Sequence, residues 1–327
     1  MGKPLNDIFY GKIILFGEYG IIFDSMALTI PFTHFHGELS FNNDNDRFKY
    51  TDYDFALNSN GQLREFAENL TKLKKENLLP EDINTEEFSE DLKKGLYFES
   101  TIPQGFGLGS SGALVAAVYS RYAMDRIDGG RSVTKTDILK LKDIFSAMEN
   151  HFHGRSSGID PLNSYIKFPL LITSKTQIET VGIPRNKYNG DSAIFLLNTG
   201  QPGKTGPLVN HFIQLCDNPE YFSIITDQYI PLNSLCINNL ISGELNSFFV
   251  NLTRLSELQY THFQSMIPDH VRNIWKEGLD SDTYKLKLCG SGGGGYLLGF
   301  TENLPEAQQL FRGKQIEMVT VYKSGKN

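Results

Sequence analysis

Cysteine is scarce in this chain of 327 residues, and the three that occur, Cys216, Cys236 and Cys289, are widely spaced. An odd, scattered set forms neither a disulfide framework nor a zinc site, so we expect a reducing, cytoplasmic environment. No stretch approaches the roughly 20 apolar residues of a membrane-spanning helix. The first residues also lack the apolar run of a signal peptide. We therefore expect no membrane as a partner.

An excess of positive charge is also missing, because 31 Lys and Arg residues stand against 38 Asp and Glu residues. Nucleic acids are bound through clustered Lys and Arg, so a formal net charge of −7 predicts no nucleic acid partner. A local basic pocket could still hold a phosphorylated small molecule. The apolar share of 40% and the charged share of 21% are those of an ordinary globular protein, and the length suits two domains.

Apolar patterning predicts strands and helices without a regular alternation between them. The expected strands cover residues 11–16, 97–101, 193–198, 284–288 and 296–300. The expected helices cover residues 62–79, 113–124, 135–151, 205–216, 244–266 and 268–278, and the mixed-charge stretch 73–94 is expected to be an exposed helix and its connection. Such a mixture favours an α+β fold over a doubly wound sheet. A polar loop with Pro and Gly at residues 184–191 marks the expected domain boundary, so that the domains comprise residues 1–188 and 189–327.

A glycine-rich loop lies between a predicted strand and a predicted helix, and it contains Gly105, Gly107, Leu108, Gly109, Ser110, Ser111 and Gly112. Glycine lets the backbone approach a ligand closely, and the free amides at a helix start bind anions. The two serine hydroxyls are suited to phosphate or to Mg²⁺. No Lys follows the glycines as in a P-loop, and no acidic residue ends a second strand as in a dinucleotide-binding fold. The alternative is a flexible loop at a helix entry.

Two further segments accompany this loop, GKIILFGEY at residues 11–19 and KLCGSGGGGY at residues 287–296. In this order and at these separations, the three resemble the signature motifs of the GHMP kinases, named for galactokinase, homoserine kinase, mevalonate kinase and phosphomevalonate kinase. The resemblance spans roughly residues 9–300. It implies a two-domain α+β fold, in which residues 1–188 form an ATP-binding and catalytic domain like ribosomal protein S5 domain 2. Residues 189–327 would form a ferredoxin-like domain.

Within this superfamily the segment from Glu149 to Asp160 is most similar to mevalonate kinases, where a Glu stands eleven residues before an Asp in an S-G-[IV]-D motif. The resemblance implies that Asp160 takes the proton of the acceptor hydroxyl or orients that hydroxyl. It places Lys12 near Asp160, and it assigns Mg²⁺ to Glu149 and Ser111, although Ser110 and Ser111 cannot be told apart from the sequence. Phosphoryl transfer requires this kind of positioning and charge neutralisation.

The other motifs indicate which residues bind the substrate. The resemblance assigns substrate binding to Glu18 and Tyr19, to Gly290, Ser291 and Gly292, and to Lys204 and Thr205. For the glycine run 290–295 the alternative is a tight turn between two strands. For residues 204–205 it is a solvated loop.

The implied activity is ATP- and Mg²⁺-dependent phosphorylation of a hydroxyl group on a small molecule. Mevalonate, converted to 5-phosphomevalonate for isoprenoid precursors, is the favoured acceptor. Mevalonate kinases commonly carry a His where this chain has Tyr19, a feature closer to phosphomevalonate kinases. Phosphomevalonate kinase, another GHMP kinase, diphosphomevalonate decarboxylase and a catalytically silent ligand-binding relative therefore remain alternatives. A homodimer is one expectation for the assembly.

Two pairs of histidines are spaced as in some metal sites, at residues 34 and 36 and at residues 151 and 153. No cluster of carboxylates or cysteines completes either set, so we do not expect a structural zinc. The second pair stands beside Glu149 and is expected to shape the loop of the active site.

Overall fold

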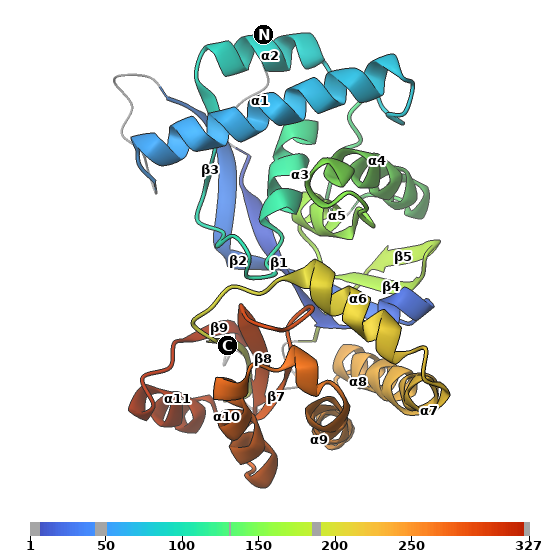
Figure 1. Ribbon diagram of the computed structural model, residues 1–327, viewed down its shortest axis with the longest axis vertical. Coiled ribbons are helices and arrows are strands. Elements are labelled where there is room, and N and C mark those ends of the chain that lie inside the picture. The colour runs from blue at the N-terminus through green and yellow to red at the C-terminus, as the bar shows by residue number, and fades with distance from the viewer. Residues whose placement is uncertain (1–6, 43–50, 131, 185–190, 324–327) are drawn as a thin grey trace. The chain divides into compact units, whose positions relative to one another are not determined.

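The structure is a computed structural model that describes residues 7–42, 51–130, 132–184 and 191–323 (Figure 1). The chain forms two compact units. The first comprises residues 1–12, 30–103 and 108–168, and the second comprises residues 13–29, 104–107 and 169–327. The predicted boundary between residues 188 and 189 lies outside the described residues. The units are also interleaved along the chain, since residues 13–29 and 104–107 are part of the second.

Two strands near the start of the chain contribute to both units, β1 (Phe9–Phe16) and β2 (Ala27–Phe41). In the first unit the end of β2 pairs antiparallel with β3 (Leu96–Ser100), from Gly37 opposite Ser100 to Phe41 opposite Leu96. In the second unit the start of β2 pairs with β4 (Leu170–Ser174), which in turn pairs with β5 (Gln177–Thr180).

Five helices complete the first unit: α1 (Tyr53–Lys75), α2 (Thr85–Lys93), α3 (Ser110–Tyr122), α4 (Lys135–His153) and α5 (Ile159–Ile166). Helix α1 lies alongside α2 and β3, while α3 packs against α4 and α5 (Figure 1). Small buried residues on α3, among them Gly112, Ala113 and Ala116, permit this close packing. Helix α4 begins with a capping box between Thr134 and Asp137.

The second unit is built on a four-stranded sheet of β6 (Ala193–Asn198), β7 (Lys285–Leu288), β8 (Tyr296–Thr301) and β9 (Met318–Lys323). The order across the sheet is β7-β8-β6-β9, and the pairs β7–β8, β8–β6 and β6–β9 are antiparallel. With helices after β6 and after β8, this is the ferredoxin-like β-α-β-β-α-β arrangement. The predicted ferredoxin-like domain is therefore confirmed. Because the chain forms two compact units that combine helices with sheets, the predicted α+β, two-domain fold is confirmed as well.

The helices of the second unit are α6 (Thr205–Leu215), α7 (Pro219–Ile224), α8 (Ile230–Ser242), α9 (Leu245–His262), α10 (Asp269–Asp280) and α11 (Leu304–Gly313). Short helical turns occupy Gly20–Phe23, Ile225–Tyr229 and Gln264–Met266. Helix α9 packs against α8, α10 and β7. No helix among the described residues is long and apolar enough to cross a membrane.

Most predicted elements are present, with different ends. Helix α1 begins at Tyr53 rather than at residue 62, because tertiary hydrogen bonds hold its first turns in place. The Ser59 hydroxyl donates to the Phe98 carbonyl at 3.1 Å and accepts from the Phe98 amide at 2.9 Å. The Asn60 amide donates to Leu96 O at 2.6 Å. These contacts with β3 outweigh the weak helix propensity of the sequence around Gly61.

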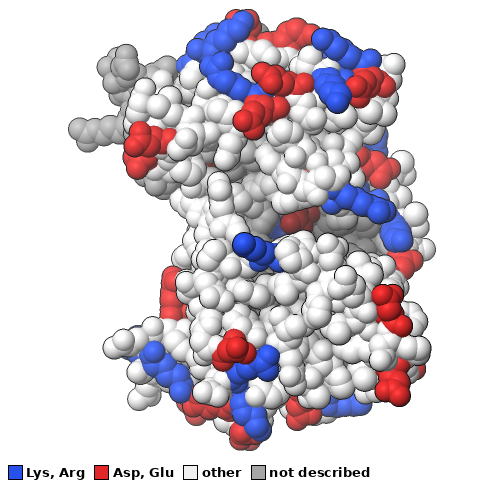
Figure 2. All heavy atoms as spheres, in the orientation of Figure 1, with Lys and Arg blue, Asp and Glu red and all other residues white. Residues whose placement is uncertain are grey.

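The mixed-charge stretch 73–94 forms the end of α1, a connection and α2, as predicted. Ion pairs run along it, including Lys74 with Asp82 at 2.8 Å and Lys93 with Glu90 at 2.6 Å. Figure 2 shows basic and acidic side chains interspersed over this part of the surface.

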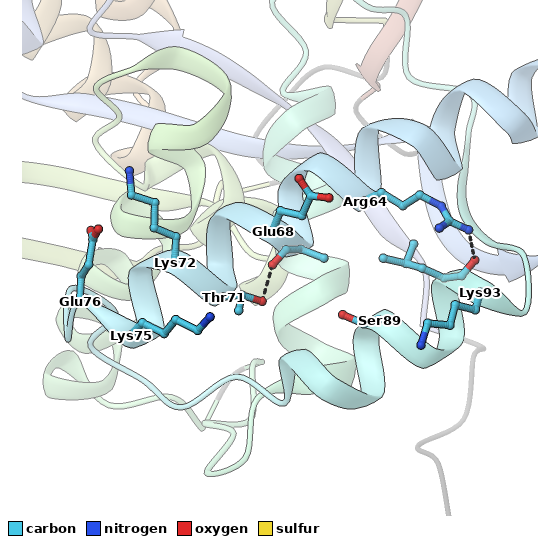
Figure 3. A pocket seen from close by; sticks show the side chains of 10 residues that line it. Arg64, Glu68, Thr71, Lys72, Lys75, Glu76, Ser89 and Lys93 are labelled. Atoms are coloured by element: carbon cyan, nitrogen blue, oxygen red, sulfur yellow. Dashed lines mark hydrogen bonds between the residues drawn. The ribbon is translucent and has the colours of Figure 1, made fainter.

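A cavity of about 520 Å³ lies between α1 and α2 (Figure 3). Its lining includes Arg64, which donates to Leu92 O at 3.1 Å, and the charged side chains of Glu68, Lys72 and Glu76 on the same helix. None of the predicted site residues lines this cavity.

Candidate active site

The glycine-rich loop ends in an open helix start. Gly109 stands at the N-cap of α3 in the left-handed region (φ 73°), and within the described part of the chain no side chain caps this helix. Such a start leaves backbone amides free to bind an anion. The loop is anchored to β1, because the Lys12 amide donates to Leu108 O at 2.9 Å.

Glycine is required at residue 112, where α3 meets the start of α5. A Cβ there would lie 2.8 Å from the backbone carbon of Asp160 and 2.8 Å from the nitrogen of Pro161. Any side chain would push the two helices apart. Glycine at this position therefore permits the start of α3 to approach Asp160 closely.

Lys12 and Asp160 form an ion pair, with 3.1 Å between Lys12 Nζ and Asp160 Oδ1. The lysine side chain is 6% exposed and the aspartate side chain 31% exposed, so the ammonium is enclosed while the carboxylate faces solvent. Asp160 stands in the first turn of α5, where the helix dipole favours a carboxylate. The structure thus brings together the two residues to which the resemblance assigns the chemistry.

Glu149 lies in the last turns of α4 and is 3% exposed. One carboxylate oxygen accepts a hydrogen bond from Ser111 Oγ at 3.2 Å, and the other accepts one from Ser156 Oγ. Burial raises the pKa of Glu149 from 4.5 to about 7, and the charge of Asp160 contributes to the rise. The hydrogen bonds from Ser156 and Ser111 and the charge of Lys12 act in the opposite direction.

Two neighbours of this site make contacts that the sequence did not specify: His153, which was expected only to shape the loop of the active site, and Ser156, for which no role was expected. His153 Nε2 lies 2.9 Å from Ser111 Oγ, one helical turn after Glu149 on α4. Ser156 contacts the Glu149 carboxylate, and its own amide donates to Asn150 Oδ1 at 2.6 Å. The predicted helix ended at residue 151, whereas α4 continues to His153 and so places that side chain one turn after Glu149. The Ser156 contact depends on a loop conformation that has no sequence signature.

Ser111 and Glu149 have the chemistry of magnesium ligands, because both offer oxygen atoms and the Glu149 side chain is a buried carboxyl group. Mg²⁺ is usually bound by one or two carboxylates together with substrate phosphates and water. No group of three or more His, Cys, Asp or Glu side chains within the described ranges could hold a metal without other ligands. The donor set therefore fits a cation that arrives with a phosphate ligand. Ser110 shares the open start of α3, but the hydroxyl that contacts Glu149 is that of Ser111.

The predicted substrate residues at the first motif are enclosed in the second unit. Glu18 is 3% exposed, and its carboxylate pairs with Lys287 Nζ at 2.6 Å. Tyr19 is 4% exposed, its hydroxyl donates to Ser291 O at 2.6 Å, and its ring packs on Phe212 with centroids 4.5 Å apart. Burial raises the pKa of the Tyr19 phenol. Direct contact of the Glu18 side chain with a ligand is not supported by this placement, because protein groups already surround it.

The other predicted substrate residues of the second unit form a more open group. Ser291 Oγ donates to Thr205 Oγ1 at 3.1 Å, and Lys204 precedes the first residue of α6. Beyond Ser291 the glycine run is held by backbone hydrogen bonds, Gly293 N to Met266 O at 2.7 Å and Gly295 N to Gln201 O at 2.6 Å. The tight-turn interpretation thus accounts for the end of the run. At its start, the Ser291 hydroxyl is the group that contacts the open Thr205 side chain.

The predicted ATP-binding loop is divided between the units. Leu108, Gly109, Ser110, Ser111 and Gly112 lie in the first unit, whereas Gly105 and Gly107 lie in the second. There Gly105 O accepts from the amide of Gly203 at 3.0 Å. The structure therefore groups the proposed catalytic and metal-binding residues in the first unit and the proposed substrate residues in the second.

Comparisons with known proteins identify a matching family model. Residues 74–165 match the family model of the GHMP kinases N terminal domain. No curated protein sequence matches the chain.

Solved structures resemble the chain over nearly its whole length. The L. major mevalonate kinase in complex with R-mevalonate is 18% identical, with a TM-score of 0.62 and coverage of 100% of both chains. The Streptococcus pneumoniae phosphomevalonate kinase with phosphomevalonate and AMPPNP is 16% identical, with a TM-score of 0.59, covering 96% of this chain and 99% of that one. The Lactococcus lactis galactokinase with galactose is 15% identical, with a TM-score of 0.60 and coverage of 99% and 95%. At such identities the likeness establishes the fold.

Proposed function

Because the resemblance to the GHMP kinases is confirmed and the chain has their two-domain fold, we propose that it is an ATP- and Mg²⁺-dependent kinase that phosphorylates a hydroxyl group of a small metabolite. The observation that carries this proposal is the ion pair between Lys12 and Asp160 beside the open start of α3. A protein that only binds a ligand has no use for a carboxylate paired with a buried ammonium at an anion site. In phosphoryl transfer the carboxylate can orient the attacking hydroxyl, and the ammonium can neutralise charge on the phosphoryl group.

In the proposed reaction the acceptor oxygen forms a bond to the γ-phosphorus of ATP while the bond from that phosphorus to the β–γ bridging oxygen breaks. ADP leaves, and the hydroxyl proton passes to the Asp160 carboxylate. Lys12 pairs with that carboxylate and offsets negative charge on the transferred group. The amides at the start of α3 hold phosphate oxygens in place, which orients the γ-phosphate for in-line attack.

Ser111 and Glu149 are the residues proposed to hold Mg²⁺, which would neutralise phosphate charge when bound. Glu149 must be ionised to accept a divalent cation, and its raised pKa places that ionisation close to neutral pH. Ser156 and Ser111 stabilise the ionised carboxylate through their hydrogen bonds. His153 holds Ser111 from the other side and so restricts the direction of its hydroxyl.

We propose mevalonate as the acceptor, on the strength of the motif from Glu149 to Asp160 and of the likeness to the mevalonate kinases. Thr205, Ser291 and Lys204 would recognise the acceptor carboxylate, because they are open polar groups in the motifs to which the resemblance assigns the substrate. 5-Phosphomevalonate is the second candidate. The Tyr19 hydroxyl is already bonded to Ser291 O, so it does not replace the His that mevalonate kinases present at this position.

A coupled ADP-release assay with mevalonate, 5-phosphomevalonate, homoserine and galactose tests the proposal. We expect ADP release with mevalonate, and none when either Mg²⁺ or acceptor is left out. Release with only one of the other acceptors would correct the substrate and retain the reaction. ATP binding without release for any of the four would contradict the proposed kinase activity and favour a silent relative.

A further inference from the structure

A fully enclosed ion pair lies in the second unit, between the first and the last of the three sequence motifs. Glu18 Oε1 is 2.6 Å from Lys287 Nζ, and the two side chains are 2% and 0% exposed. Lys287 Nζ also donates to Leu288 O at 2.7 Å and lies 5.2 Å from the centroid of the Phe16 ring. The pair therefore links the turn after β1 with the last residues of β7.

Gln259 of α9 joins the same two segments a second time. Its Nε2 donates to Glu18 Oε1 at 2.6 Å, and its Oε1 accepts the amide of Leu288 at 2.8 Å. The side chain is 0% exposed, so neither bond is exchanged for water. One buried amide thus connects the acid of the first motif with the backbone that leads into the glycine run of the last.

Two tyrosines bond the backbone of the same segments. Tyr229 OH donates to Glu18 O at 2.7 Å, and Tyr19 OH donates to Ser291 O at 2.6 Å. Ser291 stands in the open part of the glycine run and its hydroxyl meets Thr205. The position of this proposed acceptor-binding segment is therefore determined by groups that do not themselves face the acceptor.

Burying two charges is costly, and a buried pair is weak evidence for stability. Glu18 Oε2 shows the cost directly, since it is buried without a hydrogen-bond partner within the described part of the chain. A group left unsatisfied in this way needs a reason other than stability. We propose that Glu18, Lys287 and Gln259 are positioning residues, which hold Gly290, Ser291 and Gly292 in the conformation that receives the acceptor. The role of that segment rests on the function proposed above.

Hydrogen exchange and kinetics of matched variants test this role. In Glu18→Gln and in Lys287→Met we expect amides in peptides covering residues 287–295 to exchange roughly 10-fold faster than in the unsubstituted protein. We expect kcat to fall roughly 10- to 100-fold, because small displacements in an active site have effects of that size. The KM for ATP should stay within about twofold, since the proposed ATP-binding groups of the first unit are unchanged.

The buried pair of Asp91 and Arg121 offers a matched control. These side chains are 2.7 Å apart and 7% and 11% exposed, and they lie in the first unit away from the proposed site. Asp91→Asn makes the same chemical change as Glu18→Gln. It should lower Tm comparably, while exchange in residues 287–295 and kcat remain close to those of the unsubstituted protein.

The double variant Glu18→Gln/Lys287→Met removes both charges and keeps an amide that can bond to Gln259. We expect it to regain most of the lost Tm and little of the lost kcat. Recovery of both, or unchanged exchange and kcat in the single variants, would show that the pair contributes only stability and would overturn the inference. Faster exchange is measurable even if no acceptor is turned over, so failure of this inference and failure of the proposed kinase activity are distinguishable.

Discussion

The buried carboxylate of Glu149 makes folding stability depend on pH in an unusual direction. Its pKa is raised from 4.5 to about 7, mainly by burial and then by the charge of Asp160. Between these two values the folded protein holds a proton on Glu149 that the unfolded chain has lost. Stability from this group is therefore greatest at low pH and declines as pH rises toward 7, opposite to the effect of a carboxylate in a favourable ion pair.

The size of this effect follows from the two pKa values. The shift from 4.5 to about 7 changes the free energy of unfolding by roughly 3 kcal/mol, and most of this change falls between pH 5 and pH 8. The Gln side chain of Glu149→Gln cannot ionise, so the free energy of unfolding of this variant lacks that pH-dependent change. We expect the free energy of unfolding of the unsubstituted protein, minus that of Glu149→Gln, to be roughly 2 to 3 kcal/mol lower at pH 8 than at pH 5.

Urea denaturation followed by circular dichroism, at a series of pH values and with a chelator present, measures this difference. All other titrating groups are shared by the two proteins and cancel to first order. Glu68→Gln, an exposed change on α1, controls for the substitution of Glu by Gln itself. A difference that is constant from pH 5 to pH 8, or that grows in favour of the unsubstituted protein as pH rises, would refute the reasoning.

Further predictions concern the same site and the core. Because Mg²⁺ must displace the proton on Glu149, the Mg²⁺ concentration for half-maximal ADP release should rise as pH falls from 8 to 6, and an unchanged concentration would place the metal elsewhere. Asp160→Asn should lower turnover roughly 10²- to 10⁴-fold with ATP binding retained, as measured by ADP release and calorimetry, and near-normal turnover would contradict its role. Ser156→Ala removes a hydrogen bond that lowers the Glu149 pKa, so the stability difference above should have its midpoint at higher pH, whereas a lower midpoint would contradict this contact. Trp275 is fully buried, and its indole nitrogen donates to Ser256 Oγ at 2.9 Å. Its replacement by Ala should lower the free energy of unfolding by roughly 3 to 5 kcal/mol, and a loss below about 1 kcal/mol would show that neighbouring side chains fill the cavity.

The fold was predictable from the sequence where apolar spacing is regular. Helix α4 carries Ile138, Leu141, Phe145 and Met148 on one buried face, and its start agrees with the prediction. The start of α1 was not predictable, because bonds from Ser59 to β3 stabilise turns that are weak helix formers. Local propensity does not include such contacts.

The sequence suggested the residues of the proposed site, but not their environment. The spacing of Glu149 and Asp160 and the place of Lys12 in the first motif led to the pair that the structure brings together. Glu18 was assigned to the substrate, yet its partner Gln259 lies 241 residues further along the chain. No pattern around residue 18 reveals that partner.

The sequence by itself determined the three motifs, the class of fold and the residue types of the proposed site, because these depend on short spacings and on the chemistry of single side chains. Tertiary structure alone decided that Glu18 is enclosed with Lys287, that His153 meets Ser111, and that the pKa of Glu149 is raised to about 7. Burial and distance between charges depend on segments far apart in the chain, and these two quantities control the cost of a charge inside a protein.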